Sequence, residues 1–537
     1  MRPASLPCYR GHRYDFPEGV PSGVDTDGDN GFPRRGPTRV DRGGHSSVRG
    51  AADGAVLALD VGTSSCRASL YNVRGRPIKD RFAHVAYSPT ITPDGGAELD
   101  PNLLFDQLCS VIDQVLASHP PKILAVATDT FWHSLLGLDA RGEPLTPVYL
   151  WLDARSRTEV PLLRRQLDVR EVHARVGTVL HWSYWPAKLS WLRRTQPDVF
   201  KRVTRWISFG ELVLARLTGQ TGVSVSMASG TGLLDIHRCT FDPELLSVVG
   251  IDPDQLAQIE PLKNTSTALP RTVERWPVLK EVPWLLAIGD GASSNIGAGC
   301  TTPDRFAVMV GTSAAERVVW SPDGSFELPW GAWCYRVDER RVVVGGALND
   351  GGNLMSWLRS TLRLPSLRAA EAELATVEPD GHGLTVLPFW GGERSTGWAD
   401  DARGAVVGLR LHTRPVDILR ACQEAVALRF GELDRILHQA MPGGREIVAT
   451  GGALLHSPTW MQTLADVLDR PVLASAEAEA SSRGASLVAL ETLGLLARPL
   501  EKLRPATRSR FEPVPAHTER YRAAAERQRH LYDALVQ

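Results

Sequence analysis

The tetrapeptide Val-Gly-Thr-Ser occurs twice, at residues 61–64 and 310–313. The first copy directly follows the short apolar run 56–60, and the second begins with the last residue of the run 306–310. Small residues after a buried strand form a tight turn, and the exposed backbone amides of such a turn can hold an anion. The two copies lie 249 residues apart, about the length of one large domain. The repeat therefore predicts two similar halves that face one another, each with a glycine turn.

Apolar runs with the character of strands alternate with helical patterns along most of the chain. Strands are expected at residues 56–60, 66–72, 123–128, 284–288, 306–310 and 447–450, and helices at 157–170 and about 458–469. The first two runs, joined by a glycine turn, predict a hairpin. Strands that alternate with helices predict an α/β fold with helix-covered sheets.

The pattern divides the chain into four parts. Residues 1–54 are rich in Gly, Pro and Arg and lack apolar periodicity, so we expect a disordered tail or an upstream start codon chosen in error. Residues 55–302 and 303–500 are expected to be the two domains, with a boundary in the turn-like segment 300–304. Residues 501–537 are expected to be a C-terminal helical extension.

Charge and apolar content exclude several classes of protein. Lys and Arg number 60 against 61 Asp and Glu, a formal net charge of -1, so we expect no nucleic-acid or anionic-membrane partner. No apolar run approaches the roughly 18 residues of a membrane helix. The 7 cysteines are scattered without paired spacing, which predicts neither disulfides nor a zinc site and favours a reducing cytoplasm. The oligomeric state stays open, with a homodimer as one candidate.

The first glycine turn has the composition of a phosphate site. Thr63, Ser64 and Ser65 offer hydroxyl groups and close backbone approach, and Asp60 ends the preceding strand, where it could hold Mg²⁺. The alternative is a plain hairpin turn in which Asp60 accepts a local hydrogen bond. The second copy, with Gly311 and Thr312, favours the phosphate interpretation.

Asp290 lies between two glycines after the apolar segment 284–288 and before an expected helix. A helix N-cap would explain the aspartate but not both glycines, whereas the close approach of a ligand would explain them. A carboxylate at this place could accept the proton of a substrate hydroxyl as its oxygen attacks phosphorus.

Two further glycine turns precede expected helices. The segment 450–453 (Thr-Gly-Gly-Ala) ends a strand, where nucleotides commonly bind in α/β sheets, although a simple connection fits as well. The segment 349–353 (Asn-Asp-Gly-Gly-Asn) is the other turn.

Aromatic and polar residues gather in the first half, in the segments 131–134, 151–155 and 181–185 with Lys188. Indole rings can stack on the CH faces of sugars, while Asp, Arg and His bind hydroxyl groups. Most tryptophans are core residues, and Asp153 could cap a helix, so the alternative is structural. Together the segments predict a polyhydroxylated ligand.

These motifs, in this order, resemble those of the FGGY carbohydrate kinases, and the resemblance covers residues 55–500. The motifs are Asp60-x-Gly-Thr-Ser-Ser, Trp151-x-Asp-x-Arg, Gly289-Asp-Gly-Ala, Gly311-Thr-Ser and Thr450-Gly-Gly-Ala. The gluconate kinase branch is the most similar, through Trp132-His-Ser, Arg175-Val-Gly-Thr with His181, Asn349-Asp-Gly-Gly, and Gly392-Glu-Arg followed by Arg403-Gly-x-x-x-Gly-Leu. The chain departs from the family at Trp132, where such kinases usually carry Met, and at residues 395–397, where they usually have an Ala-Pro stretch.

The resemblance implies a two-domain, actin-like ATPase fold of ribonuclease H-like halves, with ATP in the cleft and the sugar mainly on the N-terminal half. It implies Asp290 as the catalytic base and Asp60 with Asp290 as the Mg²⁺ region. The residues that it implies for ATP are Thr63, Ser64, Ser65, Arg67, Gly311, Thr312, Gly352, Gly451, Gly452 and Ala453. The residues that it implies for the substrate are Trp132, His133, Trp151, Asp153, Arg155 and Asp290.

The function expected from the resemblance is ATP-dependent phosphorylation of a sugar or sugar acid, D-gluconate to 6-phosphogluconate. A carboxylate substrate needs a cationic partner, for which Arg155, Lys188, His133 and His181 are candidates. The alternatives are a xylulokinase-like pentulose kinase, an actin-like ATPase that works by conformational change, and an inactive sugar-binding sensor.

Overall fold

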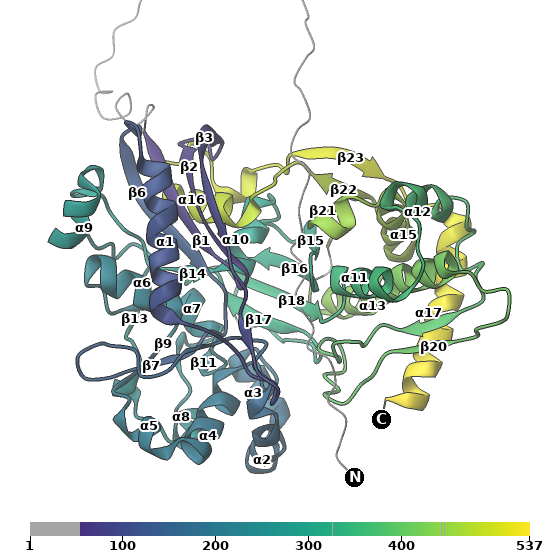
Figure 1. Ribbon diagram of the computed structural model, residues 1–537, viewed down its shortest axis with the longest axis horizontal. Helices are drawn as coiled ribbons and strands as arrows, with labels where there is room; N and C mark the ends of the chain where they lie inside the picture. The colour runs from purple at the N-terminus through teal and green to yellow at the C-terminus, as the bar shows by residue number, and fades with distance from the viewer. Residues whose placement is uncertain (1–53, 325, 442, 445, 537) are drawn as a thin grey trace, which may run out of the picture. The chain divides into compact units, whose positions relative to one another are not determined.

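The computed structural model describes residues 54–324, 326–441, 443–444 and 446–536 (Figure 1). The predictions for the N-terminal tail therefore lie outside the described residues, apart from Gly54. Within the described ranges, no helix combines the length and the apolar character that crossing a bilayer requires.

The first half is built on a five-stranded sheet with the strand order β14-β6-β1-β2-β3. The strands are β1 (Ala55–Val61), β2 (Ser65–Asn72), β3 (Pro77–Ala86), β6 (Ile123–Thr130) and β14 (Ile288–Gly289). β1 and β2 form the predicted antiparallel hairpin, while β6 runs parallel to both β1 and β14. β1 is buried along its whole length, as its sequence predicts, which is apolar except for Asp60.

The second half repeats this arrangement in a seven-stranded sheet with the order β17-β18-β16-β15-β21-β22-β23. The strands are β15 (Arg305–Val310), β16 (Ala314–Trp320), β17 (Trp333–Arg336), β18 (Val342–Leu348), β21 (Glu446–Thr450), β22 (Val472–Ser475) and β23 (Thr507–Phe511). β15 and β16 are an antiparallel hairpin, and β15, β21 and β22 are parallel. The order β22-β21-β15-β16-β18 thus matches β14-β6-β1-β2-β3, and the predicted duplication is confirmed.

Helices α10 (Asp290–Gly297) and α16 (Ala480–Thr492) cross closely and tie the two halves together. α16 belongs to the second half of the sequence but packs on β1 and β6 of the first sheet (Figure 1). The crossing requires glycine, because a Cβ on Gly297 would lie 1.8 Å from the Ala480 carbonyl oxygen and one on Gly484 would lie 1.8 Å from that of Ser293.

Between β6 and β14 the chain forms a mainly helical region with its own apolar cluster. Its helices are α2 (Val160–Gln166), α3 (Val169–Val176), α4 (Trp185–Thr195), α5 (Pro197–Arg202), α6 (Phe209–Thr218), α7 (Val225–Ser229), α8 (Pro243–Val249) and α9 (Pro270–Arg275). Short strands in the first half are β4 (Thr90–Ile91), β5 (Ala97–Leu99), β7 (Leu136–Leu138), β8 (Val148–Tyr149), β9 (Arg205–Ile207), β10 (Val223–Ser224), β11 (Leu234–Asp235), β12 (Thr240–Phe241) and β13 (Ile259–Glu260). α1 (Pro101–Leu116) covers β2 and β3.

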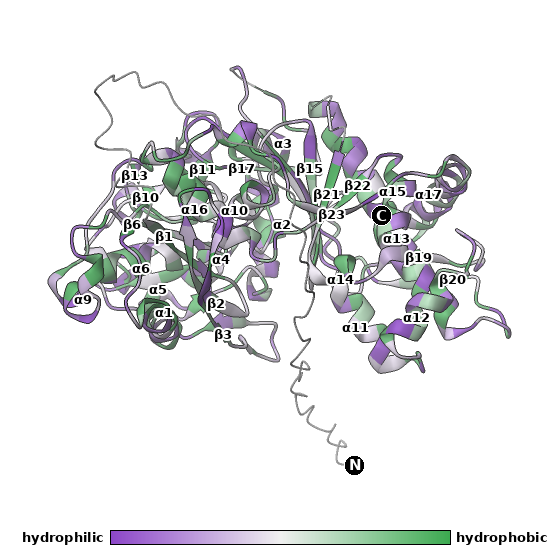
Figure 2. Cartoon of the chain, turned by 90° about the horizontal axis from the view of Figure 1, so that it is seen from above, coloured by the Kyte–Doolittle hydropathy of each residue, from purple (hydrophilic) through white to green (hydrophobic). Residues whose placement is uncertain are grey.

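The second sheet carries its own helices, with the long α13 at their centre. They are α11 (Gly352–Thr361), α12 (Leu367–Leu374), α13 (Pro415–Ala440), α14 (Gly452–Leu455), α15 (Pro458–Leu468) and α17 (Pro515–Leu535), with the short strands β19 (Thr385–Leu387) and β20 (Ala405–Val407). α12 and α17 show both hydrophilic and hydrophobic residues in Figure 2, as expected of helices with one face on the protein. α17 packs on α13, α15 and β19.

Two predicted elements differ from the structure. The helix predicted over 157–170 is broken, because the chain leaves the helix at Leu167 and the Asp168 carboxylate then caps α3 by accepting from the amides of Arg170 and Glu171. The strand predicted over 284–288 shrinks to β14, since Trp284 makes only isolated bridges, to Val126 and Ser266.

Candidate active site

A cavity of about 450 Å³ brings the two Val-Gly-Thr-Ser turns together. The predicted site residues that line it are Thr63, Ser64, Arg67, Trp132, His133, Trp151, Asp290, Gly311 and Thr312. The predicted residues that do not line it are Asp60, Ser65, Asp153, Arg155, Gly352, Gly451, Gly452 and Ala453. The volume suits a small-molecule ligand.

The first turn connects β1 to β2 and is closed by a hydrogen bond from the Gly62 amide to the Ser65 carbonyl, 2.9 Å. Ser65 is buried where β2 begins, whereas Thr63 and Ser64 face the cavity. A Cβ on Gly62 would meet only the Ser65 oxygen, at 3.4 Å, so packing does not require this glycine. The open space beside the turn fits an anion held by backbone and hydroxyl groups.

The second turn connects β15 to β16 and closes in the same way, with a 3.0 Å hydrogen bond from the Gly311 amide to the Ser313 carbonyl. A Cβ on Gly311 would also meet little, the nearest atom being the Met309 sulfur at 3.4 Å. Thr312 is exposed at the tip of the turn. The two turns are therefore alike in hydrogen bonding as well as in sequence.

Gly352 and Gly451 have a packing role beside the second turn. The Gly352 amide donates to the Gly311 carbonyl at 2.8 Å, and a Cβ on Gly352 would lie 2.4 Å from the same oxygen and 3.1 Å from the Ala453 Cβ. Gly451 has φ +88, and its Cβ would lie 2.3 Å from the Val310 oxygen. These contacts hold the starts of α11 and α14 against the end of β15, whereas Gly452 is open, with His456 at 3.8 Å.

Asp290 is the first residue of α10 and accepts a 2.7 Å hydrogen bond from the Gly291 amide. Burial raises the pKa of its carboxyl group to about 6; the nearby Arg317 opposes this shift and Asp60 adds to it. A carboxylate with this pKa is ionised at neutral pH and still basic enough to accept a proton.

Glycine is required on both sides of Asp290 for a reason that the sequence did not reveal. A Cβ on Gly289 would lie 1.8 Å from Trp132 Cε2, and one on Gly291 would lie 2.6 Å from Trp132 Cζ3. The indole nitrogen of Trp132 donates to the Ser226 carbonyl at 3.0 Å, which fixes the ring. The glycines therefore accommodate the indole, and the expectation that they serve ligand approach is corrected on this point.

Three carboxyl groups meet at the ends of adjacent strands β1, β6 and β14. Asp60 pairs in register with Asp129, and β14 leads directly into Asp290. Arg67 Nη1 contacts Asp60 at 3.2 Å, while neither oxygen of the fully buried Asp129 has a hydrogen-bond partner among the described residues. Burial and the nearby Asp60 and Asp290 raise the pKa of Asp129 well above its ordinary value.

These carboxyl groups offer the oxygen ligands that a hard divalent cation prefers, but their oxygens do not all lie within 4.8 Å of one another, so they are not a ready-made metal site. Asp60 and Asp290 were predicted for this role, but Asp129 was missed. Its strand is predictable, whereas its alignment with Asp60 depends on the parallel pairing of β1 with β6.

Aromatic residues also line the cavity. The Trp132 and Tyr335 ring centroids lie 4.6 Å apart, and His133 meets Tyr184 edge-on at 4.9 Å. The hydroxyl groups of Tyr184 and Tyr335 are 2.8 Å apart. Burial lowers the pKa of His133 to about 3, and its Nδ1 bonds the Gly230 carbonyl, so this imidazole is neutral. Trp151 Nε1 donates to Thr63 Oγ1 at 3.2 Å, so this tryptophan is bonded to the first turn.

Asp153 and Arg155, two predicted substrate residues, are engaged with one another. Arg155 Nε donates to Asp153 at 3.1 Å, and Arg155 Nη2 donates to Glu98 at 2.8 Å. Asp153 also accepts from the Ala97 amide at 3.2 Å. These contacts anchor the segment that carries Trp151. Arg317, Tyr335 and Arg394 line the cavity but were not predicted as site residues, although Arg394 belongs to the Gly392-Glu-Arg motif.

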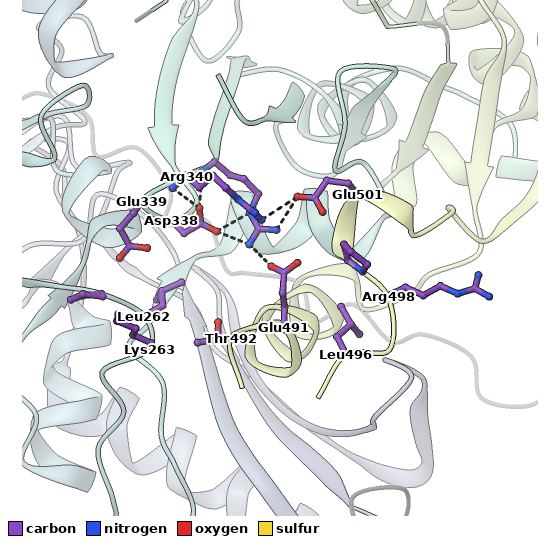
Figure 3. A pocket seen from close by; sticks show the side chains of 13 residues that line it. Leu262, Lys263, Asp338, Glu339, Arg340, Glu491, Thr492, Leu496, Arg498 and Glu501 are labelled. Carbon is purple, nitrogen blue, oxygen red and sulfur yellow. Dashed lines mark hydrogen bonds and ion pairs between the residues drawn. The ribbon is translucent and has the colours of Figure 1, made fainter. Parts of the chain in front are cut away.

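A second cavity, of about 820 Å³, lies beside the turn between β17 and β18 and the end of α16 (Figure 3). Arg341 lines it, with Nη2 2.5 Å from Asp338 and 2.6 Å from Glu491 and with Glu501 close by. No residue predicted for the site lines this cavity.

The two matching sheets, with a cavity lined by residues of both halves, define an actin-like ATPase fold of two ribonuclease H-like domains. The models of the N-terminal and C-terminal domains of the FGGY family of carbohydrate kinases match residues 55–297 and 306–492. The chain therefore belongs to the FGGY family of carbohydrate kinases, and the resemblance seen in the sequence is confirmed.

Relatives of this chain bear the names of kinases for different substrates. It is 26% identical over 458 residues to a gluconokinase of Bacillus subtilis, covering 82% of this chain and 88% of the relative. It is 30% identical over 465 residues to a xylulose kinase of Streptomyces rubiginosus, covering 83% and 89%. The crystal structure of gluconate kinase from Lactobacillus acidophilus matches with a TM-score of 0.84 at 26% identity, covering 90% of this chain and 98% of that one.

Proposed function

We propose that this chain transfers the terminal phosphoryl group of ATP to a terminal hydroxyl of a sugar acid, D-gluconate, and yields 6-phosphogluconate and ADP. The observation that carries the proposal is the shared cavity, in which Asp290 lies with both Gly-Thr-Ser turns. The similarity to gluconokinases supports the choice of substrate.

In the proposed reaction the Asp290 carboxylate accepts the proton of the substrate hydroxyl. The hydroxyl oxygen forms the new bond to the terminal phosphorus, and the bond from that phosphorus to the bridging oxygen of ADP breaks. The turns at Thr63 and Thr312 would hold the phosphate groups with amide and hydroxyl donors. Asp60, Asp129 and Asp290 would hold Mg²⁺, which neutralises phosphate charge when it is bound.

Contacts between the halves support the exclusion of water from this reaction. His181 Nε2 lies 3.2 Å from Asp400, and Tyr184 meets Tyr335 from the second half. An enclosed site keeps water from competing with the sugar as acceptor.

The test is ADP release by the full chain with Mg²⁺ and ATP against gluconate, xylulose and glycerol. We expect gluconate to give the highest kcat/KM and Asp290→Asn to lower its kcat by about 100-fold to 10,000-fold, since it removes a general base. Asp254→Asn, which changes an exposed aspartate, is the matched control and should leave kcat unchanged. Near-normal turnover by Asp290→Asn would refute the assignment of the base.

A pentulose kinase is the second candidate, favoured by the xylulose kinase relatives. A higher kcat/KM for xylulose than for gluconate would replace the first proposal with this one. ATP turnover that no sugar stimulates would favour an actin-like ATPase, and sugar binding without phosphoryl transfer would favour a sensor.

A further inference from the structure

A sugar acid brings a carboxylate into the cavity. The cationic side chains that the sequence offers as its partners are already bonded to other groups of the protein. Arg155 is bonded to Asp153 and Glu98. The buried Lys188 donates to the carbonyl oxygens of Ser183 at 2.6 Å and His133 at 3.2 Å.

The other cationic candidates for the carboxylate are also bonded to protein groups. His181 is paired with Asp400. His133 is bonded to the Gly230 carbonyl and is held neutral by its burial. Arg67, which also lines the cavity, is bound by Asp60 and by Glu479, at 3.2 and 3.3 Å.

Two guanidinium groups line the cavity without a salt bridge within the described part of the chain, those of Arg317 and Arg394. Their nearest acidic influences are Asp290 on Arg317 and Asp350 on Arg394. The Nε atoms of both are buried and have no hydrogen-bond partner there. The only side-chain hydrogen bond of Arg394 among these residues runs from Nη2 to the Leu348 carbonyl, at 3.3 Å. An unpaired buried cation is costly, and it is stabilised when an anionic ligand enters.

The two arginines are close enough to affect one another, but their other neighbours differ. A Cβ on Gly291 would lie 3.4 Å from Arg317 Nε, so Arg317 is next to Asp290, where negative charge develops on the transferring phosphate. Arg394 lies instead over the Trp151 ring, 4.7 Å from its centroid, and beside Tyr184 and Tyr335.

The loop that carries Arg394 is rigidly held. The Ser395 amide donates to the Ala347 carbonyl at 3.0 Å, and the Ser395 hydroxyl accepts from the Ala347 amide at 3.1 Å. The neighbouring Glu393 accepts from Arg429 at 2.6 Å and from Tyr532 at 2.8 Å. A planar guanidinium fixed in this way is suited to bind a carboxylate through two parallel hydrogen bonds.

We propose that Arg394 determines specificity for sugar acids by binding the substrate carboxylate. In the carbon chain of the substrate, this carboxylate is at the end opposite to the hydroxyl that Asp290 deprotonates. This inference rests on the proposed function. It predicts preference for an acyclic sugar acid over the neutral polyol of the same length, which offers a hydroxyl group in place of the carboxylate.

The test compares kcat/KM for D-gluconate and for D-glucitol, which differ at this one carbon. We expect Arg394→Gln to lower kcat/KM for gluconate roughly 100-fold, mainly through KM, and to change the value for glucitol less than about threefold. Arg394→Lys keeps the charge but loses the paired geometry, so we expect a loss of about tenfold on gluconate. Arg410→Gln, which changes an exposed arginine in the second half, is the control and should preserve both values.

The outcomes separate this inference from the proposed function. If the unaltered protein phosphorylates no sugar acid, the proposed function fails and the inference fails with it. If it phosphorylates gluconate but Arg394→Gln keeps the ratio of gluconate to glucitol, only the inference is overturned. An equal loss on both substrates would instead assign Arg394 to closing the halves on Trp151, and a raised KM for ATP would assign it to the phosphate. Should Arg394→Gln not fold, an unchanged ratio in Arg394→Lys would overturn the inference in the same way.

Discussion

The contact between Gly289 and Trp132 predicts a strong coupling between these two positions. In Gly289→Ala the new Cβ would lie 1.8 Å from Trp132 Cε2 and 2.1 Å from Nε1, whereas unstrained carbon contacts need about 3.5 Å or more. The indole would have to move by roughly 1.5 Å, but Gly230 and Gly291 confine it, since a Cβ on either would lie within 2.2 or 2.6 Å of the ring.

Two terms contribute to the cost of Gly289→Ala. Overpacking of this kind costs about 1–3 kcal/mol, and loss of the indole hydrogen bond to the Ser226 carbonyl costs about 1 kcal/mol more. We therefore expect the free energy of unfolding to fall by about 2–4 kcal/mol. Because residue 289 precedes Asp290, kcat should fall as well.

The assay is a double-mutant cycle with Trp132→Met, followed by urea denaturation and by ADP release. Methionine is slender and flexible, so in that background Gly289→Ala should cost less than about 1 kcal/mol. The coupling free energy should therefore be about 1–3 kcal/mol. An equal cost of Gly289→Ala in both backgrounds would refute the claim that the indole requires this glycine.

Three other predictions concern protonation and the support of the cavity. Because the pKa of Asp290 is about 6 and its ionised form is the base, kcat/KM should fall as the pH drops below about 6; a flat profile down to pH 5 would contradict this. Arg317 favours the ionised form, so Arg317→Gln should move this acid limb upward by about one pH unit or more, and an unmoved limb would show that Arg317 does not act on Asp290. Tyr532→Phe removes a hydrogen bond to the buried Glu393, so it should lower the free energy of unfolding by about 1–2 kcal/mol. It should also raise KM for gluconate, because the loop that carries Arg394 loses support. An unchanged denaturation midpoint would contradict this role of α17.

The sheets were predictable from the sequence because their central strands are buried and continuous in apolar character. The runs at 56–60 and 306–310 are followed by identical turns, and this local signal led to both hairpins and to the duplication. Where structure depends on a partner strand, the local signal fails. The apolar segment 284–287 is buried like a strand, yet it contacts β6 only through the isolated bridge of Trp284 to Val126, and the regular pairing with β6 is confined to β14.

The site was predictable where its residues lie in short motifs, as Thr63, Thr312 and Asp290 do. Arg317 and Tyr335 reach the cavity from within strands and carry no local mark, whereas Arg394 lies in the Gly392-Glu-Arg motif but was not predicted as a site residue. Asp129 becomes part of the acidic group only through the register of β6 with β1, and Arg317 reaches Asp290 only because α10 packs near β16. Conversely, Asp153 and Arg155 belong to a recognisable motif, but they pair with one another behind Trp151.

The duplication alone does not explain catalysis, because the two equivalent turns differ in the charges beside them. The first half contributes buried carboxyl groups at Asp60, Asp129 and Asp290, and the second contributes the unpaired guanidinium groups of Arg317 and Arg394. Burial raises the pKa of Asp129 and lowers that of Arg394 to about 10, so each set is held where its charged form is disfavoured. A ligand set with a divalent cation on the acidic side and anionic groups on the arginine side relieves both penalties at once. Under the proposed function, the free energy released by that neutralisation would favour closure of the halves, and it would be available only when nucleotide, metal and an anionic acceptor are bound together.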